Sequence, residues 1–244
     1  MEELTLRLSS KISNISLLIL SIAISIIVLI GSSESYSHSR VTDNLEFYSN
    51  GFSAKYGNRL SSYGDITYRS GNSDAMEGNF SLGLGGAATL LEGPLSKTSS
   101  YIFSFRRSYL DVIAGALNAG GLPSYDDIQG KITFQPNHYN TLTILSVNGN
   151  SLYERTKEDA LKEEQSNYGR RKNKQHTIGV NYRKIWNQSS FSNTSISQSN
   201  QRADAQFLDY NSGSITSMAN NQLKSSSIRQ INQTSFSNNL SSEY

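Results

Sequence analysis

The chain has 244 residues, of which 17% are charged, and a formal net charge of +2 at pH 7. So small a charge gives no electrostatic reason to expect a nucleic acid or another polyanion as partner, and the absence of cysteine excludes disulfides and thiolate metal sites. Proline is scarce at 3, against 18 Gly, 14 Tyr and 9 Phe. That mixture is typical of transmembrane barrels, in which small residues face the lumen and aromatic residues form girdles at the two interfaces.

The N-terminus carries the one helical membrane signal of the sequence. Arg7 and Lys11 precede an apolar run over residues 15–30, and small residues follow it. A helix needs about 20 apolar residues to span a bilayer, so a shorter core behind a basic segment favours a secretory signal peptide. We therefore interpret residues 1–35 as a signal peptide or N-terminal hydrophobic segment. An uncleaved inner-membrane anchor is the alternative, because no clean Ala-x-Ala cleavage site follows.

The next feature is a motif, Gly-Phe-Ser-Ala-Lys-Tyr-Gly-Asn-Arg-Leu-Ser-Ser, over residues 51–62, with the strand-like Asp-Ile-Thr-Tyr at residues 65–68. This stretch resembles the end of the plug domain of TonB-dependent outer-membrane receptors of the Bacteroidetes type. The resemblance continues through residues 91–95 and 105–111, and beyond residue 150 it holds only in pattern. Asn50 departs from the family, which usually has glycine there.

The resemblance implies that residues 36–74 are the C-terminal tail of a plug. About 20 residues separate the hydrophobic segment from the motif, which is far too short for a whole plug with its own core. We expect no TonB-contacting box and no N-terminal regulatory domain in this sequence. Six residues match the family motif at the plug–barrel junction and are interpreted as structural: Gly51, Tyr56, Gly57, Asn58, Arg59 and Asp65. We expect Arg59 to pair with carboxylates of the barrel wall.

Residues 78–85 alternate Phe80, Leu82 and Leu84 with small polar residues. Period two with small polar partners predicts a strand whose sides face lipid and lumen. The glycine pair at residues 85–86 predicts a tight hairpin into a second strand over residues 87–95. A third strand follows, with its aromatic residues on one face: Tyr101, Phe103 and Phe105.

Four further strands are predicted over residues 128–135, 141–148, 176–185 and 190–199. Long connections (112–127 and 154–175) alternate with short ones (136–140 and 186–188), as expected for a barrel with short periplasmic turns and longer outer loops. Trp186, in a short turn, suits an interface girdle.

From residue 187 onward Ser, Asn and Gln dominate the sequence. This composition fits a polar strand pair, long outer loops or disorder. Residues 228–236 are the candidate for an eighth strand, and Tyr244 is a candidate terminal aromatic residue of an outer-membrane protein.

The predicted fold class is all-β: a partial transmembrane antiparallel β-barrel of about eight strands over residues 75–244, preceded by the plug tail and the N-terminal segment. The family barrel has about 22 strands, and eight of them leave unpaired edges that lipid does not satisfy. We therefore expect a receptor fragment. A small autonomous outer-membrane barrel with a structural or adhesion role, and an inner-membrane-anchored periplasmic β domain, are the alternatives.

No residue pattern predicts catalysis or a cofactor, so we expect the chain not to be an enzyme. Residues 83–88 fit a dinucleotide-loop pattern but no helix follows, and His38, His138 and His176 lack metal-site spacing. The acidic pairs at 126–127 and 163–164 point to opposite faces on a strand, and are expected to be loop charges. The basic cluster at 170–174 is interpreted as a solvated outer loop, or as a contact for lipopolysaccharide phosphates.

For a whole receptor, the resemblance implies energy-coupled import of a ligand such as a ferric siderophore, cobalamin or an oligosaccharide. Its partners would be outer-membrane lipid and the TonB complex, and its place the outer membrane of a Gram-negative bacterium. The sequence does not identify the ligand, and the fragment alone is not expected to be competent for transport.

Overall fold

A computed structural model describes residues 41–48, 63–83, 86–110, 123–237 and 240–243. The described residues are almost entirely β-structure, which confirms the predicted all-β class. A two-stranded antiparallel sheet is formed by β1 (Thr42–Tyr48) and β2 (Tyr63–Tyr68). The predicted strand at residues 65–68 is therefore confirmed as part of β2, whereas β1 was not predicted.

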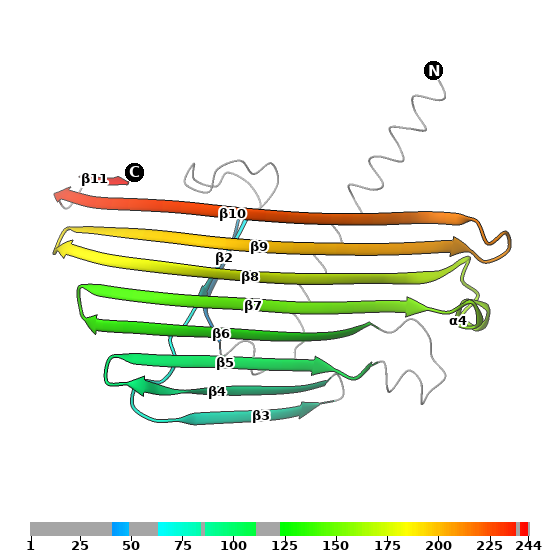
Figure 1. Ribbon diagram of the computed structural model, residues 1–244, viewed down its shortest axis with the longest axis horizontal. Helices are drawn as coiled ribbons and strands as arrows, with labels where there is room; N and C mark the ends of the chain where they lie inside the picture. The colour runs from blue at the N-terminus through cyan, green and yellow to red at the C-terminus, as the bar shows by residue number, and fades with distance from the viewer. Residues whose placement is uncertain (1–40, 49–62, 84–85, 111–122, 238–239, 244) are drawn as a thin grey trace, which may run out of the picture.

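A second sheet, of nine strands among the described residues, follows in the order β11-β10-β9-β8-β7-β6-β5-β4-β3, each antiparallel to the next (Figure 1). Its strands are β3 (Glu77–Gly83), β4 (Gly86–Ser96), β5 (Ser99–Ser108), β6 (Ser124–Asn137), β7 (Asn140–Arg155), β8 (Asn167–Asn187), β9 (Ser190–Asp209), β10 (Ile215–Ser237) and β11 (Leu240–Glu243). The eight predicted strands correspond to β3–β10, and β11 adds a short ninth.

Connections differ between the two ends of this sheet. At one end β4–β5, β6–β7 and β8–β9 are joined by two-residue turns, at residues 97–98, 138–139 and 188–189. At the other end, 15 residues join β5 to β6, 11 join β7 to β8 and five join β9 to β10. The predicted alternation is confirmed for these connections. The β3–β4 connection is an exception, because it has only two residues although it lies at the second end. Gly86, the first residue of β4, has φ +158°. A Cβ atom at this position would lie only 2.4 Å from the carbonyl oxygen of Arg107, so glycine is required.

The charged connection predicted over residues 154–175 is confirmed for residues 156–166 and wrong at both ends, which belong to strands. β7 continues to Arg155, a short helix α4 (Lys157–Lys162) begins after a capping box between Thr156 and Asp159, and β8 begins at Asn167. The side chains of residues 170–175 alternate between more and less exposed positions, as in any strand, but every one of them is polar. An apolar alternation was the signal sought, and it cannot reveal a strand that is polar on both faces.

The Ser-, Asn- and Gln-rich end forms strands, which selects the polar strand pair among the three interpretations. β9 and β10 pair continuously, from Ser190 opposite Thr234 to Phe207 opposite Ser217. β10 therefore begins well before the predicted start at residue 228. Strands of this kind are held by backbone hydrogen bonds to their neighbours, so their side chains need not be apolar.

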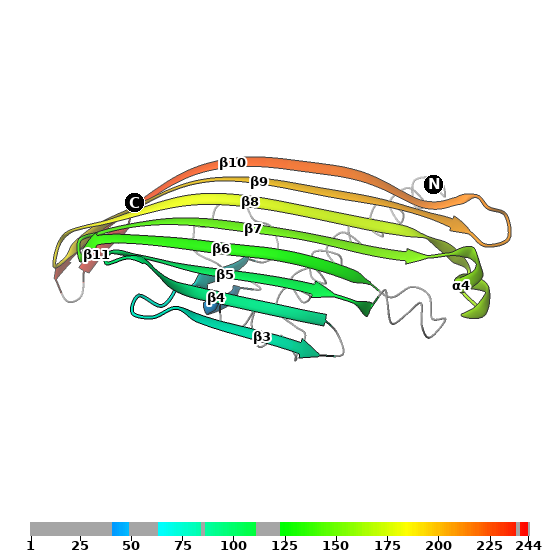
Figure 2. The same ribbon diagram turned by 60° about the horizontal axis from the view of Figure 1, so that its bottom comes forward.

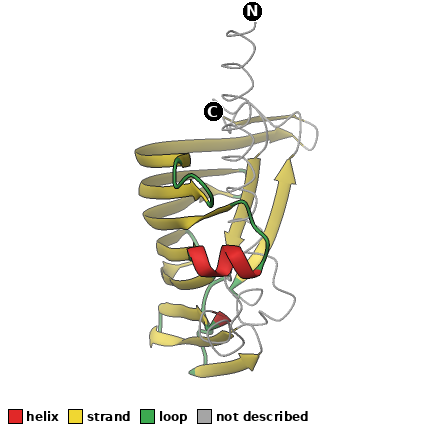
Figure 3. Ribbon diagram, turned by 90° about the vertical axis from the view of Figure 1, so that its right-hand side faces the viewer, coloured by secondary structure: helices red, strands yellow, loops and turns green. Residues whose placement is uncertain are grey.

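The strands of the large sheet are bowed along their length (Figure 2). The β1–β2 pair lies on one face of the sheet (Figure 3), and its contacts through Val41 and Tyr68 are with β4, β5 and β6. A small core joins the two sheets: Val41 is packed with Leu90 and Ile102, and Tyr68 covers it. The strands β3 and β11 are the two edges of the sheet and are not hydrogen-bonded to each other in the described residues.

Several predictions concern residues that the structure does not describe. The N-terminal segment, the terminal Tyr244 and the five junction residues from Gly51 to Arg59 lie outside the described residues. Among the helices that are described, none has the length and apolar character to cross a membrane.

Candidate functional site

The two faces of the large sheet have opposite chemistry, as β5 illustrates. Phe103 and Phe105 are each 37% exposed on one face. On the other face Ser104 and Arg106 are 0% and 4% exposed. The outward face of β5 therefore carries exposed rings, and its covered face is mostly polar apart from Ile102, which belongs to the small core. A sheet in a soluble protein usually has its apolar residues on the covered face. The predicted common face of Tyr101, Phe103 and Phe105 is confirmed.

One apolar row crosses six strands of the outward face. Residues directly opposite in an antiparallel pair share a face, and register aligns Tyr101, Ile132, Ile144, Val180, Ile196 and Ile228, which we call the central row. Exposure along this row is 43% at Ile132, 38% at Ile144 and 78% at Ile228. An exposed apolar surface this continuous indicates contact with lipid or with another protein.

The apolar zone around the central row is wide near β6 and narrow near β10. On β6 it runs from Ile128 to Phe134 on alternate residues, which is about 20 Å of strand. On β9 and β10, the next residues on the same face along each strand are polar. They are Thr194 and Gln198 beside Ile196, and Ser226 and Gln230 beside Ile228. We call the outward apolar zone the belt.

Aromatic side chains stand at the edge of the belt next to the two-residue turns. Trp186 is 59% exposed and donates its indole N–H to Ser192 Oγ at 3.0 Å. Lys184 Nζ lies 3.9 Å from the centroid of the indole ring, and Tyr182 donates to Asn140 Oδ1 at 2.6 Å. Rings with an apolar body and a polar tip suit a membrane interface. The girdle role of Trp186 stays a prediction.

On the covered face, the segment that follows β2 is bound to the sheet through Glu92 of β4. Arg69 donates two hydrogen bonds to this carboxylate, at 2.6 and 2.5 Å, and the backbone N–H of Asn72 donates a third at 2.8 Å. Ser70 Oγ lies 3.1 Å from Thr133 Oγ1 of β6. Glu92 is 6% exposed, so the ion pair with Arg69 compensates a carboxylate that is largely removed from water.

Tyr68 makes the neighbouring contact. Lys131 of β6 donates its ammonium to the Tyr68 carbonyl. Burial, with a smaller contribution from the Asp127 charge, raises the pKa of the Tyr68 phenol to about 12. The phenol is therefore neutral at any physiological pH, as its packing against Val41 requires.

A buried ion pair lies farther along the same face. Arg106 Nε of β5 is 2.7 Å from Asp127 Oδ2 of β6, with side chains 5% and 9% exposed, and the guanidinium stacks on the Tyr125 ring at 4.7 Å. The prediction that Asp126 and Asp127 are loop charges was wrong, because β6 already begins at Ser124. The two carboxylates do point to opposite faces, and Asp126 accepts from Asn150 at 2.7 Å.

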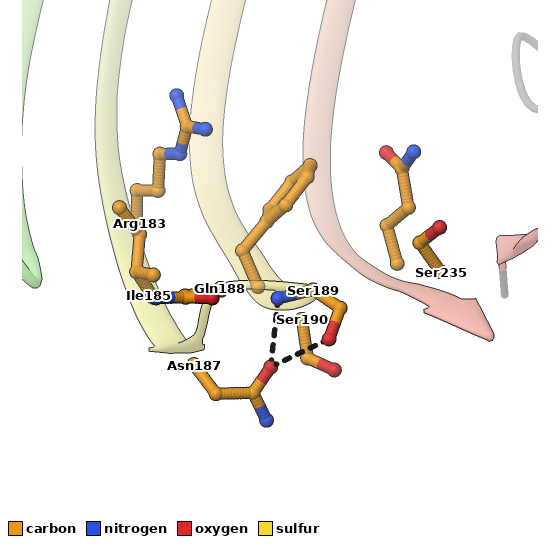
Figure 4. A pocket seen from close by; sticks show the side chains of 9 residues that line it. Arg183, Ile185, Asn187, Gln188, Ser189, Ser190 and Ser235 are labelled. Carbon is orange, nitrogen blue, oxygen red and sulfur yellow. Dashed lines mark hydrogen bonds between the residues drawn. The ribbon is translucent and has the colours of Figure 1, made fainter. Parts of the chain in front are cut away.

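A hollow lies at the β8–β9 turn, where Arg183, Ile185 and Phe191 converge with residues 187–190 and with Gln233 and Ser235 of β10 (Figure 4). Asn187 closes the turn by accepting from Ser189 N and Oγ. Arg183 is its one charged lining residue and stacks on Phe191 at 4.7 Å. A lone cation of this kind supplies no acid–base pair. In the part of the chain that is described, no group of His, Cys, Asp or Glu could hold a metal ion.

Only one of the six predicted junction residues, Asp65, lies within the described part of the chain. It stands in β2 directly opposite Glu46 of β1. The pairing expected of Arg59 stays a prediction. Arg69 makes an ion pair of the same kind with Glu92 and was missed. The signal that could have indicated it was a carboxylate inside a predicted strand, where Glu92 shares its side with Leu90.

No family model, curated protein or solved structure matches this chain. Its function is therefore inferred from the chemistry of the two sheet faces and from the segment bound to one of them.

Replacing Arg69 by alanine is expected to release residues 69–72 from the sheet. The loss of a charged hydrogen-bond pair costs about 1.5–3 kcal/mol, or roughly a tenfold to hundredfold smaller docked population. Because the chain has no cysteine, a Ser70→Cys, Thr133→Cys pair reports docking through its rate of disulfide formation. Arg155→Ala, which removes a surface arginine paired with Glu163, is the control. Equal oxidation rates in both variants would refute this role of Arg69.

Proposed function

We propose that this chain is the plug tail and the first barrel strands of a TonB-dependent outer-membrane receptor. The observation that carries the proposal is the inverted sheet: the central row faces outward, and the segment before β3 binds the polar face. In such a barrel the outward faces of the strands meet lipid and the lumen is polar. A plug inside the lumen would contact the wall as Arg69 contacts Glu92.

The topology supports the same proposal. Two-residue turns lie at one end of the sheet and the longer connections at the other, and β3 begins at the short-turn end (Figure 1). A tilted transmembrane strand needs about 9–11 residues, whereas β8, β9 and β10 have 21, 20 and 23. Their excess would project from the membrane on the side of the long connections, which in these barrels is the cell exterior.

The two open edges support the assignment as a fragment. Hydrocarbon cannot satisfy the backbone groups of β3 and β11, so a membrane sheet must continue until it closes. A receptor barrel of about 22 strands requires roughly 13 strands beyond these. The proposed activity, energy-coupled import of a ligand such as a siderophore, cobalamin or an oligosaccharide under the action of TonB, belongs to that whole receptor. Residues 1–35 would direct export.

Sequencing the DNA on both sides of the reading frame tests this proposal. We expect plug-coding sequence upstream and about 13 further strands downstream, in any frame. Unrelated genes abutting both ends would contradict the receptor assignment. In that case a small autonomous barrel, closed by an additional pairing of its edges, would be the function to pursue.

A further inference from the structure

Beyond the belt, on the side of the long connections, the outward face becomes basic. Arg170, Lys172 and Lys174 of β8 alternate along one strand, and all three are exposed. Arg202 of β9 stands directly opposite Lys174, and Lys224 of β10 lies one row nearer the belt. We call these five residues the basic patch. They lie in the halves of β8–β10 nearest α4 (Figure 1).

The distance of the basic patch from the middle of the belt, measured along the barrel axis, follows from the register of the strands. Lys174 and Arg202 each lie six residues from the central row, counted from Val180 and Ile196. At about 3.3 Å per residue and a barrel tilt of about 40°, this is roughly 15 Å above the middle of the belt. The hydrocarbon core of a bilayer extends about 15 Å from its midplane. Lys174 and Arg202 therefore lie where lipid headgroups begin. Lys224 lies one row nearer the belt, at a depth from which a long lysine side chain reaches the headgroups.

The charges of the basic patch are mostly uncompensated. Asp204 pairs with Arg202 at 2.8 Å. Within the described residues, no carboxylate forms an ion pair with Lys172, Lys174 or Lys224. Glu154 stands opposite Arg170 in register but makes no ion pair with it either. Five cations and two carboxylates, Asp204 opposite Lys172 and Glu154 opposite Arg170, thus leave this outward surface with a net positive charge.

We propose, on the basis of the proposed function, that the basic patch binds the phosphate groups of anionic lipid headgroups in the outer leaflet. Ammonium groups attract phosphate as point charges, and guanidinium groups can bind it through two parallel hydrogen bonds. The position of the patch selects lipid over a soluble anion, because its ligand must lie beside the belt. The opposite edge of the belt has Trp186 and Lys184 instead, so the two leaflets are recognised differently.

The test compares two triple variants that remove the same charge. The patch variant removes three of the five positive charges of the basic patch, through the substitutions Lys172→Gln, Lys174→Gln and Lys224→Gln. Lys157→Gln, Lys162→Gln, Arg171→Gln removes three cations at the same end, from α4 and from the other face of β8. Each chain is made in Gram-negative cells, its share in the outer-membrane fraction is measured, and the lipid A phosphate that co-purifies in mild detergent is quantified.

We expect the patch variant to lose bound lipid A, with a decrease of about fivefold per cation and on the order of 100-fold for three, while the control variant retains it. Equal retention by the two variants overturns the proposed lipid site but leaves the receptor assignment intact, provided that both chains reach the outer membrane. Absence of the wild-type chain from the outer-membrane fraction overturns the lipid site for this chain, whereas the receptor assignment, which leaves the edges of β3 and β11 open, is decided separately by the flanking DNA. Loss of a co-purifying protein instead of lipid A would identify a protein as the partner and also overturn the proposal.

Discussion

Replacing Ile144 with lysine is expected to destabilise the chain in the membrane by about 2–4 kcal/mol, the cost of a lysine on the lipid face of a barrel near the bilayer midplane. Ile144 is the middle of the central row, between Ile132 and Val180 on the neighbouring strands. Its side chain is 38% exposed although it is apolar. In lipid, this exposure means burial in hydrocarbon, and a charge there loses its hydration.

The control is Thr143→Lys, one residue away on the polar face, where Thr143 lies between Thr133 and Asn181. Substitutions that face the lumen carry no comparable cost. Both substitutions are made in the chain joined to the strands expected downstream, because a membrane sheet must be closed. Urea titration of outer-membrane vesicles, read by the gel mobility of unheated samples, then gives the free energy of unfolding for both variants. If the central row instead faces water, Ile144→Lys is expected to change the free energy of unfolding by at most about 0.5 kcal/mol and to increase the solubility of the chain. Such a small change, or such a gain in solubility, would exclude lipid contact at the central row.

The strands that sequence predicted best are those in which one face is apolar. Phe80 and Leu82, and then Phe103 and Phe105, alternate with small or polar residues, and period two follows directly from strand geometry. The part of β8 before residue 176 and the part of β10 before residue 228 lack that signal. They extend because each new strand pairs its backbone with the preceding one, so their existence depends on a partner more than on their own side chains.

The central row could not be predicted from the sequence, although all its residues were in predicted strands. Its members belong together only through register, and register is set by turn lengths and bulges. One example is the irregularity between Phe134 and Asn137 at the end of β6, which shifts the pairing with β7. The contact between Arg69 and Glu92, 23 residues apart, depends in the same way on how the preceding segment crosses the sheet.

Removal of the buried carboxylate of Asp127 is expected to have the largest effect on the polar face. In Asp127→Ala, the Arg106 guanidinium would stay 4% exposed and lose the carboxylate that lies 2.7 Å from its Nε. Breaking a buried ion pair from one side costs about 3–5 kcal/mol, because an uncompensated charge is left in a low-dielectric site. The adjacent Asp126→Ala is the matched control. It removes the same group from the opposite face and loses one exposed hydrogen bond to Asn150, worth about 1 kcal/mol.

The double variant Arg106→Ala, Asp127→Ala separates the ion pair from the other contacts of the two residues. Because the second substitution removes the stranded charge, we expect the double variant to be less destabilised than the sum of the single variants, by roughly 0.5–3 kcal/mol. The same vesicle titration measures all four free energies. Additive effects, or equal losses in Asp126→Ala and Asp127→Ala, would mean that the pair is open to water. The polar face would then be a solvated surface.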